Sequence, residues 1–271
     1  MTAIETYYDK KSSSYDSVFD TLYFKVYDAI TWRYLEPYVP SSPEAIVLDA
    51  GGGTGRWSIR MAEKGCRVIL LDISEGMLNI AKEKVEKAGL QHRIIIEKED
   101  IRKLKYSDET FDMILCEHAL FLLEEPDVAI KELARVLKKQ APMVISAQNR
   151  YVQSLIHIPS TENLASEKLD EALNIVLREK YDSMTKDTGE VKIHTWTPDE
   201  FRSLLERNGL NVQKIIGKGT TMPLRITKEL FMKKVYSEEL FNKILQLELM
   251  LCEKQDALAL AGHLQAIVYR S

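Results

Sequence analysis

Alternating glycines mark one short stretch of the chain as a binding turn. The stretch is Asp49-Ala50-Gly51-Gly52-Gly53-Thr54-Gly55, and it lies between the apolar run 46–48 and a helical pattern that begins at Arg56. A glycine-rich turn between a strand and a helix lets a ligand approach the backbone and the helix N-terminus. The dinucleotide fingerprint G-x-G-x-x-G would need glycine where Arg56 stands, and no Gly-Lys-Ser/Thr of a Walker A loop follows. The turn therefore predicts a nucleotide-like cofactor and disfavours both of those motifs.

Two further carboxylates follow successive apolar runs downstream of this turn. Asp72 ends the run 67–71, and Asp100 comes shortly after the run 93–97. Parallel strands place their carboxyl ends at one edge of a sheet, where ligands bind in open α/β folds. One carboxylate can accept hydrogen bonds from both hydroxyls of a ribose. We expect Asp49, Asp72 and Asp100 to converge on the cofactor; the alternative is that they only end strands and cap turns.

The stretch VLDAGGGTGRWS resembles motif I of the class I S-adenosylmethionine-dependent methyltransferases, in particular the group that acts on small molecules and quinones. The resemblance extends from Tyr7 to about Ser146, and more loosely over TWTPDEFRSLLERNGLNV. It implies a Rossmann-like fold with S-adenosylmethionine as the cofactor and S-adenosylhomocysteine as its product. One departure is that the family usually has Gly-Gly before the fifth strand, where this chain has Gln140-Ala141-Pro142.

The resemblance also assigns roles to individual residues. Asp72 is expected to bind the ribose hydroxyls, Ile73 and Met77 to sandwich the adenine, and Asp100 to accept from the adenine amino group. Glu117 is expected near the methionine end of the cofactor. The N-terminal pairs Tyr8-Asp9 and Tyr15-Asp16 resemble the start of the family, where tyrosines cover the cofactor; a plain amphipathic helix is the alternative. The expected cofactor-binding residues are Tyr7, Tyr15, Asp49, Gly51, Gly53, Arg56, Asp72, Ile73, Met77, Asp100, Ile101 and Glu117.

One histidine is placed to act as a general base. His118 follows Glu117 directly, so we expect it near the reactive end of the cofactor, where it could take a proton from a hydroxyl, thiol or amine. A packing or hydrogen-bonding histidine at the end of a strand is the alternative. The segment after the fourth strand, the first insertion and the region before the capping box at Thr197 are expected to contact the methyl acceptor. The candidate substrate residues there are Phe121, Tyr151 and His194.

Apolar runs alternate with helical patterns from residue 45 to residue 146, which is typical of a parallel sheet covered on both faces. We predict an α/β, Rossmann-like, doubly wound and mostly parallel sheet of about seven strands, the last one antiparallel. Residues 1–44 are expected to form a helical arm or lid, and 45–150 with 187–271 the core. Residues 151–186, which show no strand-like run, and about 220–256 are expected to form helical insertions that cap the substrate.

The composition limits the partners of the chain. Its 37 basic and 41 acidic residues give a net charge of −4, which offers no basic field for nucleic acid. Cys66, Cys116 and Cys252 lie far apart, and the five histidines are dispersed, so neither disulfides nor a metal site is expected. We find no signal-peptide core and no apolar run of about 18 residues, so we expect a cytoplasmic protein without a membrane span.

These observations favour a methyltransferase that uses S-adenosylmethionine and a small-molecule acceptor, as a monomer or homodimer. The alternatives are a methyltransferase for tRNA or protein, and a non-catalytic subunit that binds the cofactor and lends its insertions to a partner. A nicotinamide oxidoreductase is disfavoured by Arg56 and by the three spaced aspartates.

Overall fold

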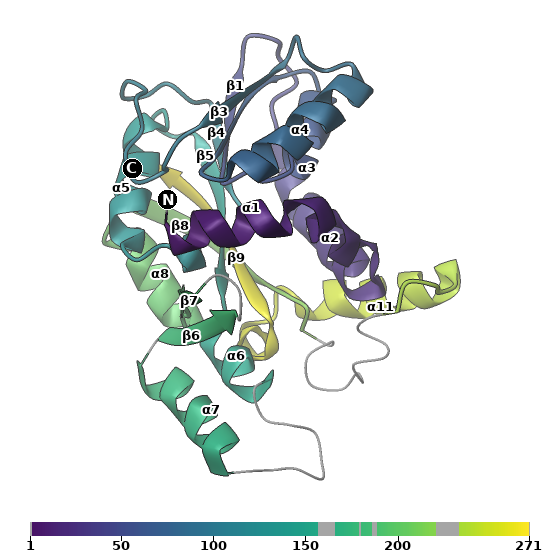
Figure 1. Cartoon of the computed structure of the whole chain (residues 1–271), viewed down its shortest axis with the longest axis vertical. Coiled ribbons are helices and arrows are strands. Elements are labelled where there is room, and N and C mark those ends of the chain that lie inside the picture. The colour runs from purple at the N-terminus through teal and green to yellow at the C-terminus, as the bar shows by residue number, and fades with distance from the viewer. Residues whose placement is uncertain (1, 157–165, 179, 186–188, 221–232, 271) are drawn as a thin grey trace.

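The computed structural model describes residues 2–156, 166–178, 180–185, 189–220 and 233–270 (Figure 1). Its centre is a seven-stranded sheet. The strands β1 to β5 are parallel to one another, and β9 is antiparallel to both of its neighbours, β5 and β8. The predicted doubly wound sheet with an antiparallel last strand is therefore confirmed. In order across the sheet, the strands are β3 (Ile94–Lys98), β2 (Arg67–Asp72), β1 (Ile46–Ala50), β4 (Met113–Cys116), β5 (Pro142–Gln148), β9 (His263–Arg270) and β8 (Leu210–Lys218).

The central strands have continuous apolar sequences because both faces of the sheet are covered. In β1, Val47 pairs with Val68 of β2 and with Met113 of β4, and all three side chains are fully buried. The strands lie within about two residues of the predicted ones at most ends, and the first β-strand ends directly at the glycine turn.

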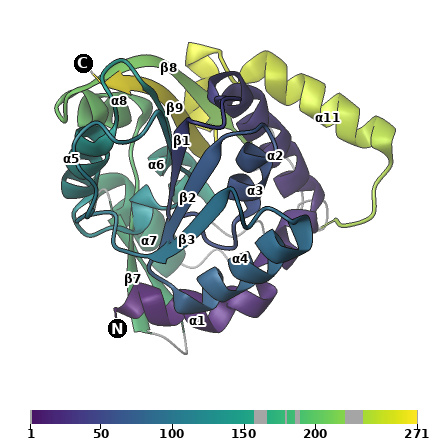
Figure 2. The ribbon, with the colours of Figure 1, turned by 90° about the horizontal axis from the view of Figure 1, so that it is seen from above.

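Helices cover the sheet as two layers (Figure 2). Residues of α2, α3 and α4 pack on one face with Val47, Val68 and Leu115, and residues of α5 and α8 pack on the other with Leu48, Ile114 and Ile145. The helices are α1 (Ala3–Tyr15), α2 (Leu22–Leu35), α3 (Arg56–Ala62), α4 (Glu75–Ala88), α5 (Pro126–Val136), α6 (Arg150–Ile156), α7 (Ser166–Arg178), α8 (Pro198–Glu206) and α11 (Glu238–Leu251), with short 3₁₀ turns at Asp16–Asp20, Glu36–Tyr38, Leu120–Leu122 and Gln255–Leu260.

Local capping residues set the ends of two helices. The Ser74 side chain accepts from the Met77 amide at the start of α4, and Gly89 ends that helix in the left-handed conformation, with φ of +68°. At α8, Thr197 and Glu200 form a capping box with proline at the first helical position. Local sequence is sufficient to set these helix ends.

The first insertion differs from the prediction in one respect. Residues 151–186 were expected to be helical only, but β6 (Lys180–Thr185) pairs antiparallel with β7 (Gly189–His194), with Lys180 opposite His194. The segment 180–185, KYDSMT, has no apolar run that would predict a strand. Such a run is not required here, because this two-stranded ribbon lies outside the main sheet (Figure 1). The predicted second excursion, about 220–256, contains α11, and its residues 221–232 lie outside the described residues.

Candidate active site

The glycine turn is held to β2 through its backbone. The amides of Gly51 and Gly52 both donate to the carbonyl of Leu71, at 2.8 and 2.9 Å. Gly51 has a φ of +77°, and a Cβ on it would lie 2.6 Å from the Cβ of Ala119, so a side chain fits neither the backbone nor the space. A Cβ on Gly53 would meet nothing closer than the Asp72 carboxylate at 4.0 Å, so the backbone at this position faces open space.

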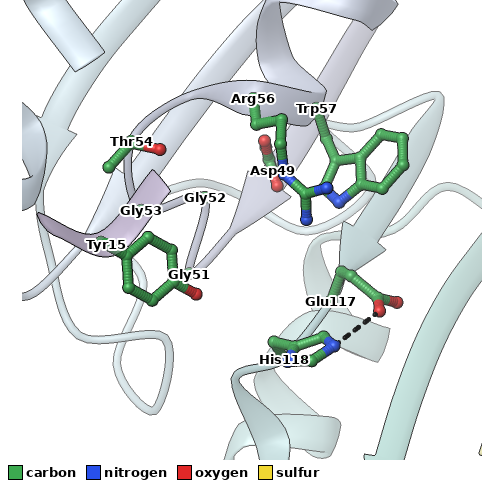
Figure 3. Close-up of a pocket in the computed structure, with 10 residues that line it drawn as sticks. All are labelled: Tyr15, Asp49, Gly51, Gly52, Gly53, Thr54, Arg56, Trp57, Glu117 and His118. Atoms are coloured by element: carbon green, nitrogen blue, oxygen red, sulfur yellow. Dashed lines mark ion pairs between the residues drawn. The ribbon is translucent and has the colours of Figure 1, made fainter. Parts of the chain in front are cut away.

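A cavity opens beside this turn, at the carboxyl ends of β1 and β4 (Figure 3). The empty space beside the turn is about 370 Å³, a volume that includes space open to solvent. Seven of the residues that line it were predicted as site residues from the sequence: Tyr15, Asp49, Gly51, Gly53, Arg56, Glu117 and His118. The sequence analysis missed the other three lining residues, Gly52, Thr54 and Trp57, although they stand within or beside the predicted motif.

Two buried polar atoms at this cavity have no hydrogen-bond partner in the part of the chain that the structure describes. They are Oε2 of Glu117, an acceptor, and Nε1 of Trp57, a donor. Both residues are at most 6% exposed. Leaving such groups unpaired is costly, so each one calls for an explanation.

Arg56 occupies the position that a dinucleotide site would give to glycine. Its guanidinium pairs with the carboxylate of Asp28 on α2 and lies 3.7 Å from the ring centre of Phe19. Both contacts come from the N-terminal segment, so Arg56 connects that segment to the first turn of α3. The side chain lines the cavity without being free to move across it.

Asp72 lies at the turn but does not line the cavity. Its Oδ2 accepts from the amide of Gly53 at 2.9 Å, and its Oδ1 accepts from the amide of Ser74 at 2.9 Å. Burial raises the pKa of this carboxyl above its ordinary value. Met77 is buried in the first turn of α4, and Ile73 is half-buried beside Asp72. Asp72 and Ile73 thus lie at the end of β2 and Met77 at the start of the following helix, with the Asp72 carboxylate in contact with Gly53.

Three other expected cofactor residues, Asp100, Ile101 and Tyr7, make contacts outside the cavity. Both oxygens of Asp100 accept from the guanidinium of Arg102, at 2.6 to 3.1 Å, and Arg102 holds the pKa of this carboxyl below its ordinary value although burial opposes it. Ile101 belongs to the apolar core on the other face of the sheet. The hydroxyl of Tyr7 accepts from Lys11 at 2.6 Å. None of the three lines the cavity.

The N-terminal arm docks on the turn and on α4 through polar contacts that the sequence did not reveal. Oδ1 of Asp9 accepts from the Ser74 hydroxyl at 2.6 Å and from the Gly76 amide at 2.9 Å. Asp16 accepts from the hydroxyl of Thr54 at 2.7 Å and from Lys84 at 3.1 Å. The arm thereby covers the turn, and the ring of Tyr15 lies beside Gly51 (Figure 3).

His118 is held in a strained backbone conformation directly after Glu117. Its φ is +59°, in the left-handed region, and its amide donates to the hydroxyl of Ser146 at 3.0 Å. Nε2 lies 2.6 Å from the hydroxyl of Tyr27. Burial lowers the pKa of His118 to about 4, so the imidazole is neutral at neutral pH. The geometry thus brings an uncharged histidine to the cavity.

Of the predicted substrate residues, only Phe121 lies near this histidine. The two ring centres are 5.9 Å apart in an edge-to-face arrangement. Tyr151 is 42% exposed on α6, and His194 is buried at the end of β7 beside the ring of Trp196. Neither Tyr151 nor His194 lines the cavity.

A buried cluster behind Glu117 is the largest feature that sequence reasoning missed. Oε1 of Glu117 accepts from the hydroxyl of Tyr27 and from the ammonium of Lys218, each at 2.7 Å. The imidazole of His263 stacks on His118, with ring centres 4.8 Å apart. Tyr27, Lys218 and His263 come from α2, β8 and β9. Tyr27 is 90 residues and Lys218 101 residues from Glu117 in the sequence, so no local motif signals the cluster.

Comparison with known proteins identifies the domain around this site. Residues 47–140 match the family model described as methyltransferase domain. This part of the chain is therefore similar to a methyltransferase domain. The matched range includes the glycine turn, Asp72, Glu117 and His118.

Two curated relatives of this chain have names that refer to different methyl acceptors. A demethylmenaquinone methyltransferase of Bacteroides fragilis is 32% identical over 149 residues, which cover 52% of this chain and 58% of the relative. A phosphatidylethanolamine N-methyltransferase of Cereibacter sphaeroides is 36% identical over 99 residues, which cover 36% of this chain and 48% of the relative. The chain thus spans about half to three fifths of the length of these relatives.

Solved structures share the fold of this chain over most of its length. An S-adenosylmethionine dependent methyltransferase from Mesorhizobium loti has a TM-score of 0.59 at 18% identity, covering 88% of this chain and 97% of that one. A geranyl diphosphate methyltransferase, in complex with GPP and sinefungin, has a TM-score of 0.56 at 12% identity, covering 90% and 78%. At these identities the comparison establishes the common fold.

The polar atoms at the cavity fit S-adenosylmethionine, the cofactor that the sequence resemblance implies. S-adenosylmethionine ends in an amino acid, whose ammonium needs acceptors and whose carboxylate needs donors. The unpaired Glu117 Oε2 and Trp57 Nε1 are one acceptor and one donor at the same cavity. Gly53 leaves room where a Cβ would otherwise stand. A cofactor with a zwitterionic end satisfies all three features.

Proposed function

We propose that this protein transfers a methyl group from S-adenosylmethionine to a small-molecule acceptor. One observation carries the proposal: a cavity at the glycine turn presents an unpaired buried acceptor, Glu117 Oε2, and an unpaired buried donor, Trp57 Nε1. Glu117 would hold the ammonium of the cofactor, and Trp57 would hold its carboxylate. Asp72, fixed by the amides of Gly53 and Ser74, would bind the ribose.

A small acceptor is supported by charge and by the relatives. The chain carries a net charge of −4, which gives no general attraction for a polyanionic RNA. The named relatives act on a quinone precursor and on a phospholipid. Aromatic rings stand around His118, with Tyr27, Phe121 and His263 in contact with it. Of this aromatic group only His118 lines the cavity, so an acceptor with an apolar or aromatic body would pack against the His118 ring.

The cofactor, when bound, supplies a methyl carbon that is already electrophilic because it is attached to a sulfonium. The residues of this chain must then orient the acceptor and exclude water. His118 can also take a proton. Because the hydrogen of the Tyr27 hydroxyl is donated to Glu117, we assign the hydrogen of the imidazole to Nε2, which donates to Tyr27. Nδ1 then carries the lone pair that would accept the proton of the acceptor.

Calorimetry with S-adenosylhomocysteine tests the cofactor assignment. We expect the wild-type protein to bind the product, and Asp72→Ala to weaken binding by about 100-fold, because hydrogen bonds to a charged group are lost. Asp170→Ala, a change at an exposed position on α7, is the matched control and should bind like wild type. If wild-type protein fails to bind S-adenosylhomocysteine at all, the proposed function is wrong.

A second assay addresses the acceptor. The protein is incubated with S-adenosylmethionine and either a reduced demethylated naphthoquinone or vesicles containing phosphatidylethanolamine, and S-adenosylhomocysteine formation is followed. Turnover with either compound supports a small acceptor. If the protein binds the cofactor but methylates only tRNA or protein, the proposal of a small-molecule acceptor is wrong and the acceptor is a macromolecule.

A further inference from the structure

Lys218 is a lysine without any contact with solvent. It is the last residue of β8, pairs in register with His263 of β9, and has 0% exposure. Its ammonium donates to Glu117 Oε1 at 2.7 Å and to the hydroxyl of Thr31 at 3.2 Å, and it lies 4.2 Å from the ring centre of Tyr27. Lysine is almost never fully buried unless it is paired, so this position has a specific partner, the Glu117 carboxylate.

The two oxygens of Glu117 are used differently. Oε1 accepts two hydrogen bonds, from Tyr27 and from Lys218, and both donors are themselves buried. Oε2 has no partner in the described part of the chain and belongs to a residue that lines the cavity. The two donors therefore hold the carboxylate from behind and leave one oxygen for a ligand.

We propose that Lys218 and Tyr27 are positioning residues that keep Glu117 charged and direct its Oε2 toward the ammonium of the cofactor. The inference rests on the proposed function, since it concerns the same cofactor site. Neither residue lines the cavity, so both act through Glu117. Three charges would then stand in a row when the cofactor is bound: the ammonium of Lys218, the carboxylate of Glu117 and the ammonium of the ligand.

A purely structural role explains this arrangement poorly. Taking a lysine and a glutamate out of water is expensive, and well-packed apolar side chains of similar size usually stabilise a core at least as well as a buried ion pair. A pair built for stability would also satisfy both carboxylate oxygens. Here one oxygen is left unpaired at the cavity, which is the arrangement that a binding site requires.

The charge state of Glu117 depends on its neighbours. Burial raises the pKa of its carboxyl, but Lys218 and His118 oppose this, together with the hydrogen bond from Tyr27, and the pKa lies below its ordinary value. Without Lys218, burial would dominate and would raise the pKa of this carboxyl. The other ionisable groups around the site are Tyr15 and Asp28 from the N-terminal segment, Asp49 and Arg56 from the turn region, and His263 from β9.

Binding of S-adenosylhomocysteine as a function of pH tests the proposal in the full-length protein. We expect Lys218→Met to weaken binding by about 10- to 100-fold at pH 7, because an interaction with a charged group is lost. The affinity of the variant relative to wild type should recover as the pH rises and Glu117 loses its proton, whereas the reverse trend would contradict the proposal. Asp49 and the ammonium of the ligand titrate in both proteins, so their effects cancel in the ratio of the variant's affinity to that of wild type. Lys214→Met, at an exposed position of the same strand, should bind like wild type.

A double-mutant cycle separates positioning from folding. In the Glu117→Gln background, Lys218→Met should change the affinity by less than about twofold, because no carboxylate remains to be held. Tyr27→Phe keeps the ring and removes one donor, so it provides a milder variant if Lys218→Met does not fold; it should weaken binding by about tenfold and shift the pH dependence in the same direction.

The outcomes distinguish this proposal from the proposed function. If wild type binds S-adenosylhomocysteine but Lys218→Met and Tyr27→Phe bind with unchanged affinity and unchanged pH dependence, the positioning role is overturned. An equal loss for Lys218→Met in the Glu117→Gln background also overturns it. If wild type does not bind, the proposed function itself fails.

Discussion

Asp9 and Gly76 are in direct contact across the interface between the N-terminal helix α1 and helix α4. The carboxylate of Asp9 accepts from the Gly76 amide at 2.9 Å. A Cβ on Gly76 would lie 3.0 Å from both the Cα and the carbonyl oxygen of Asp9, and 2.9 Å from the hydroxyl of Ser12. Glycine is unfavourable inside a helix, by about 1 kcal/mol relative to alanine. The close approach of α1 is the physical reason for its presence here.

We predict that Gly76→Ala loosens α1 while leaving α4 intact. The methyl group would stabilise α4 by about 1 kcal/mol and collide with α1, a helix that has no buried residue of its own. Hydrogen exchange should therefore accelerate by about tenfold in α1 and remain unchanged or slow down in α4. Asn79→Ala, an exposed change in the same helix, is the control. Unchanged exchange in α1 would mean that the arm does not depend on this contact.

We predict that His118→Gln slows methyl transfer without weakening cofactor binding. General base catalysis contributes about 10²- to 10⁴-fold, so a loss in this range is expected for an acceptor that must give up a proton. Binding of S-adenosylhomocysteine should change by less than about threefold, since the contact of His118 is with Tyr27 rather than with a cavity oxygen. Equal turnover of variant and wild type would make His118 a packing residue.

The low pKa of His118 also predicts its contribution to the pH dependence. Because burial lowers this pKa to about 4, the imidazole is already neutral above about pH 5 and gains its proton only as the pH falls through 4. The titration of His118 should therefore cause no rise in rate between pH 6 and pH 7. The rates of wild type and His118→Gln should depend on pH in the same way over this range. A pH–rate profile of both proteins over pH 5 to 9 is the measurement.

We predict that Asp49→Asn stabilises the protein more at pH 8 than at pH 5. Burial raises the pKa of the Asp49 carboxyl from 3.8 to about 7. Between these values the folded chain keeps a proton that the unfolded chain has lost, so stability falls as the pH rises through this range. The penalty at pH 8 is about 4 kcal/mol, at about 1.4 kcal/mol per pKa unit, and asparagine removes it.

Urea unfolding at the two pH values measures the difference for Asp49→Asn. Asp112→Asn is the matched control, because the hydrogen bond from Lys138 holds the pKa of Asp112 below its ordinary value although burial opposes it. That variant should lose stability at both pH values. A gain of equal size at pH 5 and pH 8 for Asp49→Asn would contradict the assignment of a protonated Asp49.

The role that the family resemblance gives to Asp100 requires its carboxylate to leave Arg102. We therefore predict that Arg102→Ala strengthens binding of S-adenosylhomocysteine by up to about fivefold, since an exposed ion pair is worth about 0–1 kcal/mol. Asp100→Ala should weaken it. Calorimetry on the two variants gives the answer, and opposite signs are the expected result; no effect of either change would remove Asp100 from the site.

The sequence alone determined the sheet, the binding turn and several helix ends. Buried parallel strands require uninterrupted apolar runs, and a left-handed turn against Ala119 requires glycine at position 51, so both leave a local signal. Capping is local as well, which is why Ser74, Gly89 and Thr197 could be placed in advance. The lining of the cavity by the turn, Glu117 and His118 followed from the ends of β1 and β4.

Only the tertiary structure decided which distant side chains contact Glu117 and which residues of the N-terminal arm contact α4. Lys218 reaches Glu117 because β8 and β4 end at the same edge of the sheet, although 101 residues separate them. The Asp9 carboxylate reaches the backbone amide of Gly76 across 67 residues, so no local motif signals the contact. Asp100 pairs with Arg102. The spacing of residues in the sequence does not predict whether this carboxylate binds its neighbour or a ligand. Local sequence fixes backbone conformation, whereas side chains choose partners by distance in space, and that distance is set by the fold.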